Sequence, residues 1–509
     1  MKRNILIASA IALLLLGGSA IAAVPQTAAQ RSISAALSKE PFRSGACGVL
    51  AVRMNGDTLA CINPKQRLVP ASNMKIVSTG LALRRFGPDF RFTTTLAYSG
   101  EIKDSTLFGD LFIIGGGDPT IGSKSECARE TSELFGNWRN LIRKAGISRI
   151  AGNIVGDPRF FNDPSSDNMG ASYEDIGTGY GSGPTGLSFF ENMQNFYAAP
   201  GGAVGQPIYI SPRFPETPWL QYSIAAKTGA PRSANTLYYV CTEFGPYGEI
   251  RGSFPADRRG YTLECSNKFG AYTCAYYFWK YLNGKGIKAD GYADVAPLGY
   301  IRTDLAFART GSRAPSQASL KVIGSTKSPS LADIASDTNA HSDNFFAETL
   351  FRMLGRDTFG STLQDSCRVA ANNEIRAMGI NPDLCLDIYD GSGLSRKNYA
   401  SASFFVAFLR AMARGRNFRP FYASLPQPGQ EKSSLENRFK DAPESLKDRI
   451  HMKSGSMNGV RCFSGYIDSP DGDPSRMVVF SVLTNNITKS SYTVYPLIDD
   501  IIAAIAAEN

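Results

Sequence analysis

Ser72 and Lys75 are the residues of this chain whose types and spacing most directly suggest chemistry. They lie three positions apart in Pro70-Ala-Ser-Asn-Met-Lys75, where an apolar stretch predicts the start of a helix. Residues three apart share a helix face, so the lysine can act as the base that a serine nucleophile needs. The free N–H groups of the helix start could hold an oxyanion. The pair therefore predicts acyl transfer through Ser72, although such a tetrad also arises by chance in exposed helix turns.

A serine–lysine acyl-transfer site needs two further elements, and the sequence offers each of them twice. One is a serine and a carboxamide two residues apart, and the other is a Lys-(Thr/Ser)-Gly strand that binds a substrate carboxylate. The first set also contains Glu191 and Asn195, which could hold a deacylating water as in class A β-lactamases, so as a bare pattern it matches those enzymes more closely. The two sets are Ser166-Asp-Asn168 with Lys227-Thr-Gly229, and Ser342-Asp-Asn344 with Lys453-Ser-Gly455.

The surroundings of the two sets favour the second. Ser166 lies in a loop rich in proline and aspartate with no helix before it. By contrast, Ser342 follows an amphipathic helix, Asn344 opens another, and Lys453 lies on a strand of a clear hairpin. We therefore expect the second set to complete the site around Ser72.

The elements that would position these residues come from both ends of the chain. Residues 47–61 predict a hairpin around Asn55-Gly56, directly before Ser72, and residues 449–457, 460–467 and 477–483 predict three more strands. Helices are expected at 330–337, 343–354, 367–378 and 401–414, and a final helix at 496–507 packs isoleucines on the sheet. The expected fold class is α/β (α+β), a five-stranded antiparallel sheet flanked by helices.

The middle of the chain is rich in short strands and in glycine and proline turns, which indicates an insertion after the Ser72 helix. We expect strands at 93–98 and 107–114, helices at 132–144 and 268–283, and a long surface loop at 162–186. The catalytic domain would comprise residues 23–92 and 310–509. The insertion, 93–309, would divide into two small domains, 93–115 with 205–309 and 116–204.

The N-terminus is typical of a secretory signal peptide covering residues 1–22. Lys2 and Arg3 precede an apolar run that ends in small residues, with cleavage expected after Ala22, and no later segment is long and apolar enough to span a bilayer. Export would place the nine cysteines where disulfides form. Cys47 and Cys61 lie roughly opposite each other across the hairpin turn and are the expected pair.

Composition argues against several other classes of function. With two histidines and no Cys-x-x-Cys pair, neither a metal site nor a cofactor is expected. The formal net charge of +9 falls to +7 without Lys2 and Arg3, and basic runs interleaved with aromatic residues are absent, so nucleic acid is not an expected partner.

Taken together, the motifs resemble the serine D-Ala-D-Ala peptidases of the low-molecular-mass class C penicillin-binding type, peptidase family S13. The resemblance covers about residues 40 to 490 and implies a transpeptidase-like domain, related to penicillin-binding proteins and β-lactamases, with a β-rich insertion. Lys227-Thr-Gly229 and Ser166-Asp-Asn168 would then be decoys within that insertion. One departure is Ser454, where the family usually has threonine. The matching stretches, in the family's order, begin at Pro70, Gly109, Gly116, Ala151, Glu174, Tyr180, Ser342, Asp390 and Lys453.

The resemblance implies a periplasmic serine-type D-Ala-D-Ala carboxypeptidase, with D,D-endopeptidase activity as a further possibility. Its substrates would be peptidoglycan stem peptides ending in D-Ala-D-Ala, and β-lactams would be covalent inhibitors. The implied catalytic residues are the nucleophile Ser72, the base Lys75, the proton relay Ser342, and Asn344, which would bind the substrate amide. Lys453 and Ser454 would hold the terminal carboxylate, with Gly455 and Ser456 beside them, and the N–H groups of Ser72 and Ser456 would form the oxyanion hole.

Several alternatives stay open from the sequence alone. Asn344 could simply cap its helix, and Asp390-Gly-Ser-Gly393 could be only a turn. His341 and His451 lie near the second set, but the sequence places no carboxylate to orient either ring. Cys462 is expected to be a buried thiol. The alternative functions are a β-lactamase and a non-catalytic envelope protein that binds cell-wall peptides.

Overall fold

A five-stranded antiparallel sheet built from both ends of the chain forms the centre of this computed structural model, which describes residues 26–163, 170–242, 245–295 and 315–509. The strand order is β2-β1-β22-β21-β20, so the predicted sheet is confirmed. The expected signal peptide lies outside the described residues. The strands are β1 (Ala46–Arg53), β2 (Thr58–Ile62), β20 (Ile450–Met457), β21 (Val460–Ile467) and β22 (Val478–Asn485).

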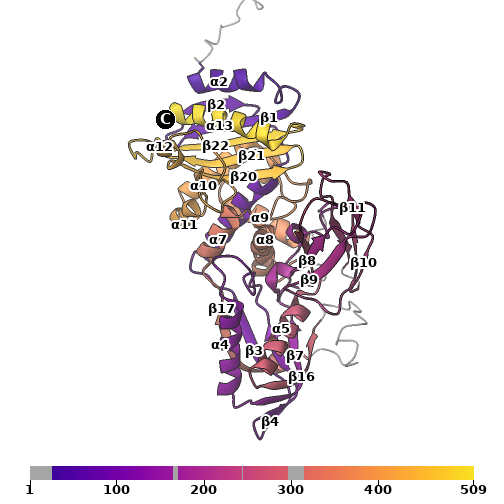
Figure 1. Cartoon of the computed structure of the whole chain (residues 1–509). Coiled ribbons are helices and arrows are strands. Elements are labelled where there is room, and N and C mark those ends of the chain that lie inside the picture. The colour runs from indigo at the N-terminus through magenta and orange to yellow at the C-terminus, as the bar shows by residue number, and fades with distance from the viewer. Residues whose placement is uncertain (1–25, 164–169, 243–244, 296–314) are drawn as a thin grey trace, which may run out of the picture.

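Helices cover both faces of this sheet (Figure 1). On one face lie α2 and α13, and on the other lie α3, α8 and α10, so every residue of the central strand β22 is buried. The helices are α2 (Ala28–Leu37), α3 (Met74–Phe86), α7 (Leu331–Ala340), α8 (Asn344–Phe359), α9 (Gln364–Ala377), α10 (Ala402–Ala413), α11 (Phe418–Ala423), α12 (Glu444–Lys447) and α13 (Ser491–Ala507).

The terminal helix α13 packs on the sheet as its apolar spacing predicts. Ile498, Ile501, Ile502 and Ile505 are all buried, and each such side chain contributes roughly 1.5–3 kcal/mol by leaving water. The helix begins at Ser491, five residues earlier than expected, and carries Pro496 inside it. Among the described residues, no helix is both long and apolar enough to cross a membrane.

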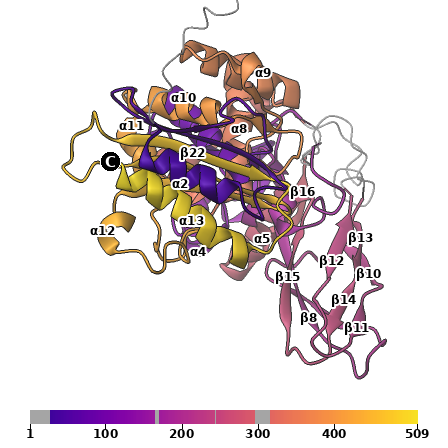
Figure 2. The same ribbon diagram turned by 90° about the horizontal axis from the view of Figure 1, so that it is seen from above.

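The insertion contains a seven-stranded sheet and several smaller sheets that project away from the central sheet (Figure 2). The large sheet has the order β17-β3-β6-β7-β5-β4, with β16 beside β7, and it packs against α4 (Thr131–Lys144) and α5 (Gly270–Gly284). Its strands are β3 (Thr93–Tyr98), β4 (Glu101–Lys103), β5 (Thr106–Phe108), β6 (Leu111–Ile114), β7 (Arg149–Asp157), β16 (Lys288–Asp294) and β17 (Lys321–Lys327).

The strand pairing in the insertion differs from the expected internal division. Strand β7 lies in the segment 116–204 that was expected to form a separate domain, yet it pairs with β6. Strand β17 follows residue 309 and pairs with β3. The smaller sheets of the insertion comprise β8 (Met193–Ala199), β9 (Tyr209–Arg213) and β15 (Tyr261–Ser266); β10 (Gln221–Ile224), β12 (Tyr238–Cys241) and β13 (Tyr247–Arg251); and β11 (Lys227–Gly229) and β14 (Ser253–Pro255). A two-stranded sheet outside the insertion comprises β18 (Leu386–Asp387) and β19 (Tyr399–Ala400).

The expected disulfide between Cys47 and Cys61 is wrong. The hairpin register places Leu50, three residues beyond Cys47, opposite Cys61, as a turn centred on Asn55-Gly56 requires. Cys47 is buried and lies opposite Thr484 of β22, whereas Cys61 is exposed at the sheet edge. All nine cysteines lie in the described residues and all are free thiols.

Candidate active site

Ser72 lies in a tight 3₁₀ turn, Ala71–Asn73, that leads directly into α3. Two glycines approach this turn so closely that neither could carry a side chain. A Cβ on Gly393 would lie 1.9 Å from the carbonyl oxygen of Ala71, and one on Gly455 would lie 2.6 Å from the carbonyl oxygen of Pro70. The turn is therefore held between the loop after Asp390 and strand β20.

Lys75 is completely buried, and three contacts fix its amine. Nζ lies 2.9 Å from Ser72 Oγ, 2.6 Å from Asn344 Oδ1 and 2.8 Å from the Ser392 carbonyl oxygen. The last two groups can only accept hydrogen bonds, so they take two N–H groups of the amine. In the neutral amine the lone pair therefore faces the Ser72 hydroxyl, as a general base requires.

The environment of Lys75 favours this neutral form. Burial lowers the pKa of Lys75 to about 8, although the nearby carboxylates of Asp343, Asp390 and Glu348 oppose the shift. A lysine with this pKa can both take and release a proton near neutral pH. The loop at 390–393 is thus more than a turn, because it supplies a hydrogen-bond acceptor and a carboxylate to the lysine.

Strand β20 brings a second buried lysine, Lys453, to the same place. Its Nζ lies 2.9 Å from Ser342 Oγ and donates to the Ser454 carbonyl oxygen at 2.8 Å. Burial, and secondly the charge of Lys75, lower the pKa of Lys453 well below its usual range. The Ser454 hydroxyl donates to Ser434 Oγ at 3.0 Å. An anion that binds beside Lys453 would therefore stabilise its charged ammonium form.

Ser342 and Asn344 flank the start of α8. Ser342 has a left-handed backbone (φ 60°), and Asp343 caps the helix by accepting a hydrogen bond from the N–H of Phe346 at 2.7 Å. Asn344 is therefore the first residue of the helix and not its cap. Its Nδ2 donates to the Tyr180 carbonyl oxygen at 2.8 Å, which turns Oδ1 toward Lys75.

A cavity of about 430 Å³ opens in front of Ser72. One wall is the loop that was expected to lie on the surface as part of 162–186, and its residues Glu174, Asp175 and Tyr180 carry charge and hydroxyl groups into the site. Sequence reasoning missed this wall, although two of its stretches are among those that resemble the S13 family. The cavity is lined by Ser72, Ser172, Glu174, Asp175, Tyr180, Ser342, Asn344, Gly393, Leu394, Arg396, Ser456, Met457 and Asn458.

The rival set of motif residues is not gathered at Ser72. Lys227 lies exposed on β11, in a two-stranded sheet of the insertion, and Asn195 donates to the carbonyl oxygen of Phe214. Residues 166–168 lie outside the described residues. Glu191 is the exception, because its buried carboxyl group lies close enough to Asp343 for each to shift the pKa of the other.

Neither histidine contacts the candidate nucleophile in the described part of the chain. The His451 ring lies against the Tyr422 ring, with 4.1 Å between centroids and the planes tilted by 32°, and burial lowers the pKa of His451. Contrary to expectation, a carboxylate does orient His341, since Nδ1 lies 2.8 Å from Asp337 Oδ1. Cys462 is a buried thiol, as expected, and burial raises its pKa to about 12.

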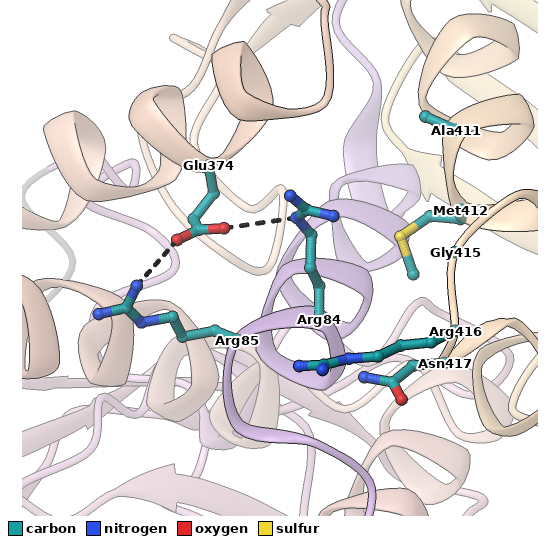
Figure 3. Close-up of a pocket in the computed structure, with 8 residues that line it drawn as sticks. All are labelled: Arg84, Arg85, Glu374, Ala411, Met412, Gly415, Arg416 and Asn417. Atoms are coloured by element: carbon teal, nitrogen blue, oxygen red, sulfur yellow. Dashed lines mark hydrogen bonds and ion pairs between the residues drawn. The ribbon is translucent and has the colours of Figure 1, made fainter.

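A second cavity, of about 500 Å³, lies at the opposite end of α3 from Ser72 (Figure 3). It is basic, but its charges are largely paired. Glu374 lies between Arg84 and Arg85, at 3.4 and 3.2 Å, and Arg85 also pairs with Asp357 at 2.7 Å. These ion pairs join the end of α3 to α8 and α9.

Comparison with known proteins gives a consistent picture. The profile of the D-Ala-D-Ala carboxypeptidase 3 (S13) family matches residues 29–508. The D-alanyl-D-alanine carboxypeptidase of Actinomadura sp. (strain R39) is 25% identical over 471 residues, which cover 90% of this chain and 81% of that protein.

Two solved structures share the fold. Penicillin binding protein 4 (DacB) from Haemophilus influenzae superposes with a TM-score of 0.77 at 19% identity, over 93% of this chain and 99% of that one. The same protein complexed with a β-lactam superposes with a TM-score of 0.71 at 18% identity, over 94% and 99% of the two chains.

Proposed function

The chain belongs to the D-Ala-D-Ala carboxypeptidase 3 (S13) family, and from this premise we propose that it is a serine-type D-Ala-D-Ala carboxypeptidase acting on peptidoglycan stem peptides. The observation that carries the proposal is the buried amine of Lys75, 2.9 Å from the Ser72 hydroxyl, with its pKa lowered to about 8. An amine so placed is a base for a serine nucleophile.

In the proposed acylation, neutral Lys75 takes the Ser72 proton while Oγ attacks the carbonyl carbon between the two terminal D-alanines. The N–H groups of Ser72 and Ser456 would bind the resulting oxyanion, an effect worth roughly 3–4 kcal/mol per donor. Lys75 then returns its proton through Ser342 to the leaving amine, and D-alanine departs. Neutral again, Lys75 can take a proton from the water that hydrolyses the ester.

The proposed carboxylate site is Lys453, with the Ser454 hydroxyl beside it. Burial disfavours the charged ammonium of Lys453, so its pKa is well below the usual range. A bound carboxylate would restore the charge and form a charge-assisted hydrogen bond. Ser454 retains the hydroxyl of the family's usual threonine, so we expect carboxylate binding to persist.

A peptidase assay tests this function. Purified protein should release D-alanine from a synthetic peptide ending in D-Ala-D-Ala, but not from the same peptide ending in D-Ala-L-Ala. Ser72→Ala should release none. Equal release by Ser72→Ala and the wild type would refute the proposal.

A β-lactamase is the enzymatic alternative, and a non-catalytic receptor for cell-wall peptide is the other. The lifetime of a fluorescent penicillin adduct separates them: the peptidase predicts an adduct that lasts for minutes, a β-lactamase predicts rapid turnover, and a receptor predicts no adduct. The similar Haemophilus influenzae protein is complexed with a β-lactam, which supports β-lactam binding by this chain, as the first two outcomes require.

The proposal extends to location and domains. The protein would act in the periplasm, after export by the signal peptide at residues 1–22. Residues 23–92 and 310–509 would form the peptidase domain and 93–309 the insertion, whose large sheet β17 joins from beyond residue 309.

A further inference from the structure

Glu191, from the insertion, lies against the segment that carries Ser342 and Asn344. Its carboxyl group accepts a hydrogen bond from Ser123 Oγ at 2.5 Å, Ser123 Oγ accepts one from the Ser125 N–H at 2.9 Å, and the Ser125 hydroxyl donates to Asp337 on α7. This chain of contacts brings Glu191 close enough to Asp343 for each carboxyl group to shift the pKa of the other. Asp343 in turn caps α8. Glu191 therefore lies close to the one residue that separates Ser342 from Asn344.

The backbone around Glu191 is held in an unusual conformation. Phe190, Glu191 and Asn192 all have left-handed backbones, with φ of 52, 52 and 49°. Residues with side chains avoid this region, and it persists only where the surroundings impose it. Here the Phe190 N–H donates to the Ile121 carbonyl oxygen at 2.9 Å, and Asn192 Nδ2 donates to the Gly183 carbonyl oxygen at 3.0 Å. Hydrogen bonds to Ile121 and Gly183 therefore fix the backbone on both sides of Glu191.

Two buried carboxyl groups this close disfavour the ionisation of both, so a proton stays on one of them. Burial, reinforced by the charge of Asp343, raises the pKa of Glu191 to about 8, and burial also raises the pKa of Asp343. At neutral pH the pair therefore holds one proton, which Glu191 carries. The Asp343 carboxylate is the charge that most raises the pKa of Lys75.

The other charged groups around the pair do not neutralise it. Asp337 on α7 raises the pKa of both Glu191 and Asp343, and its own partner is His341. Lys124 lies over the Phe190 ring, 4.9 Å from its centroid, and pairs with Glu264.

Two charged groups on nearby elements complete the surroundings. Glu126 pairs with Lys432, at 2.6 Å, and both side chains are exposed. The cation that acts on Asp343 is Lys75, whose charge lowers the Asp343 pKa. A second negative charge on the pair would therefore act directly on the base of the site.

We propose that Glu191 is a positioning residue for acylation: the proton it carries beside Asp343 holds Ser342 and Asn344 in place, and loss of that proton disables the site. This inference rests on the proposed function. Once Glu191 ionises, two buried carboxylates repel each other, which loosens the cap of α8. The added negative charge also keeps Lys75 protonated, and a protonated lysine cannot take the proton of Ser72.

The test is the pH dependence of acylation by a fluorescent penicillin. In the wild type the rate should rise with pH as Lys75 loses its proton, then fall above about pH 8 as Glu191 loses its own. Glu191→Gln keeps a hydrogen-bond donor that does not titrate, so its rate at pH 7 should stay within about twofold of the wild type and the fall at high pH should disappear. Glu191→Ala has no donor and should be slower by about tenfold at pH 7. Glu126→Gln, a matched change on an exposed carboxylate, should keep the wild-type profile.

Thermal unfolding gives a readout that does not depend on acylation. The pKa of Glu191 is raised in the folded protein, so its contribution to stability is lost as pH rises from about 4.5 to about 8. The Tm of Glu191→Gln should therefore rise relative to the wild type across this window.

The outcomes separate the two claims. A falling limb that persists unchanged in Glu191→Gln, with a constant Tm difference, would overturn the role of Glu191 and leave the proposed function standing. A uniform loss of rate in both variants, with no change in the shape of the profile, would show a merely structural role and would also overturn it. A wild type that no penicillin acylates at any pH would overturn the proposed function itself.

Discussion

The pKa of Lys75 leads to the most quantitative prediction, which concerns the rising limb of the acylation rate with pH. Acylation requires the neutral amine, and burial lowers the pKa from 10.5 to about 8. The neutral fraction at pH 7 is then about 10%, compared with about 0.03% for an ordinary lysine, a gain of about 300-fold in active base. The neutral fraction therefore increases about 50-fold between pH 6 and pH 8, and the rate constant should increase about 25-fold, because about half of Glu191 is ionised at pH 8.

Lys75→Arg supplies the matching perturbation, because a guanidinium stays protonated throughout this range. We expect its acylation rate to fall by about 10²–10⁴-fold and to lose the rising limb. The assay is the rate constant for labelling by a fluorescent penicillin, measured at constant ionic strength. Lys227→Arg, on an exposed strand of the insertion, is the matched control and should keep the full profile. A wild-type rate that is flat from pH 6 to 8, or still rising toward pH 10, would refute the assignment of Lys75 as the base.

Three further predictions address the surroundings of the base. Lys453→Ala should lower kcat/KM for a D-Ala-D-Ala peptide by a factor that corresponds to a loss of about 2–5 kcal/mol of transition-state binding, whereas Lys227→Ala should leave kcat/KM unchanged. The opposite result would favour the rival motif set. Gly455→Ala should abolish labelling by penicillin, since a Cβ there would lie 2.6 Å from a backbone oxygen of the Ser72 turn; unchanged labelling would contradict this packing. Maleimide should modify the exposed Cys61 of the native protein before the buried Cys47, and a mass change on reduction alone would reveal a disulfide that the fold does not contain.

The parts of the fold that follow from local patterns could be predicted from the sequence. The helical spacing of Ser72 and Lys75, the strand that carries Lys453, and the turn at Asn55-Gly56 each depend on a few neighbouring residues. The helix after Ser342 was also predicted, to within one residue at its start. These local elements were sufficient to choose the motif set that the structure brings together.

Features that depend on packing between distant segments could not be predicted. The wall formed by Glu174, Asp175 and Tyr180 exists because the insertion folds back onto the catalytic domain, which no local pattern records. The proximity of Glu191 to Asp343 has the same origin. The Cys47–Cys61 pairing failed because the turn centred on Asn55-Gly56 sets a register in which Cys61 lies opposite Leu50, three residues from Cys47.

The central claim is that Ser72 forms an ester with the substrate carbonyl, and mass spectrometry tests it most directly. After a brief exposure to penicillin, the wild type should gain the mass of one penicillin, on the peptide that contains Ser72. Ser72→Ala should gain none, with a circular dichroism spectrum unchanged from that of the wild type. An adduct that persists in Ser72→Ala, or that maps to any other residue, would contradict the account.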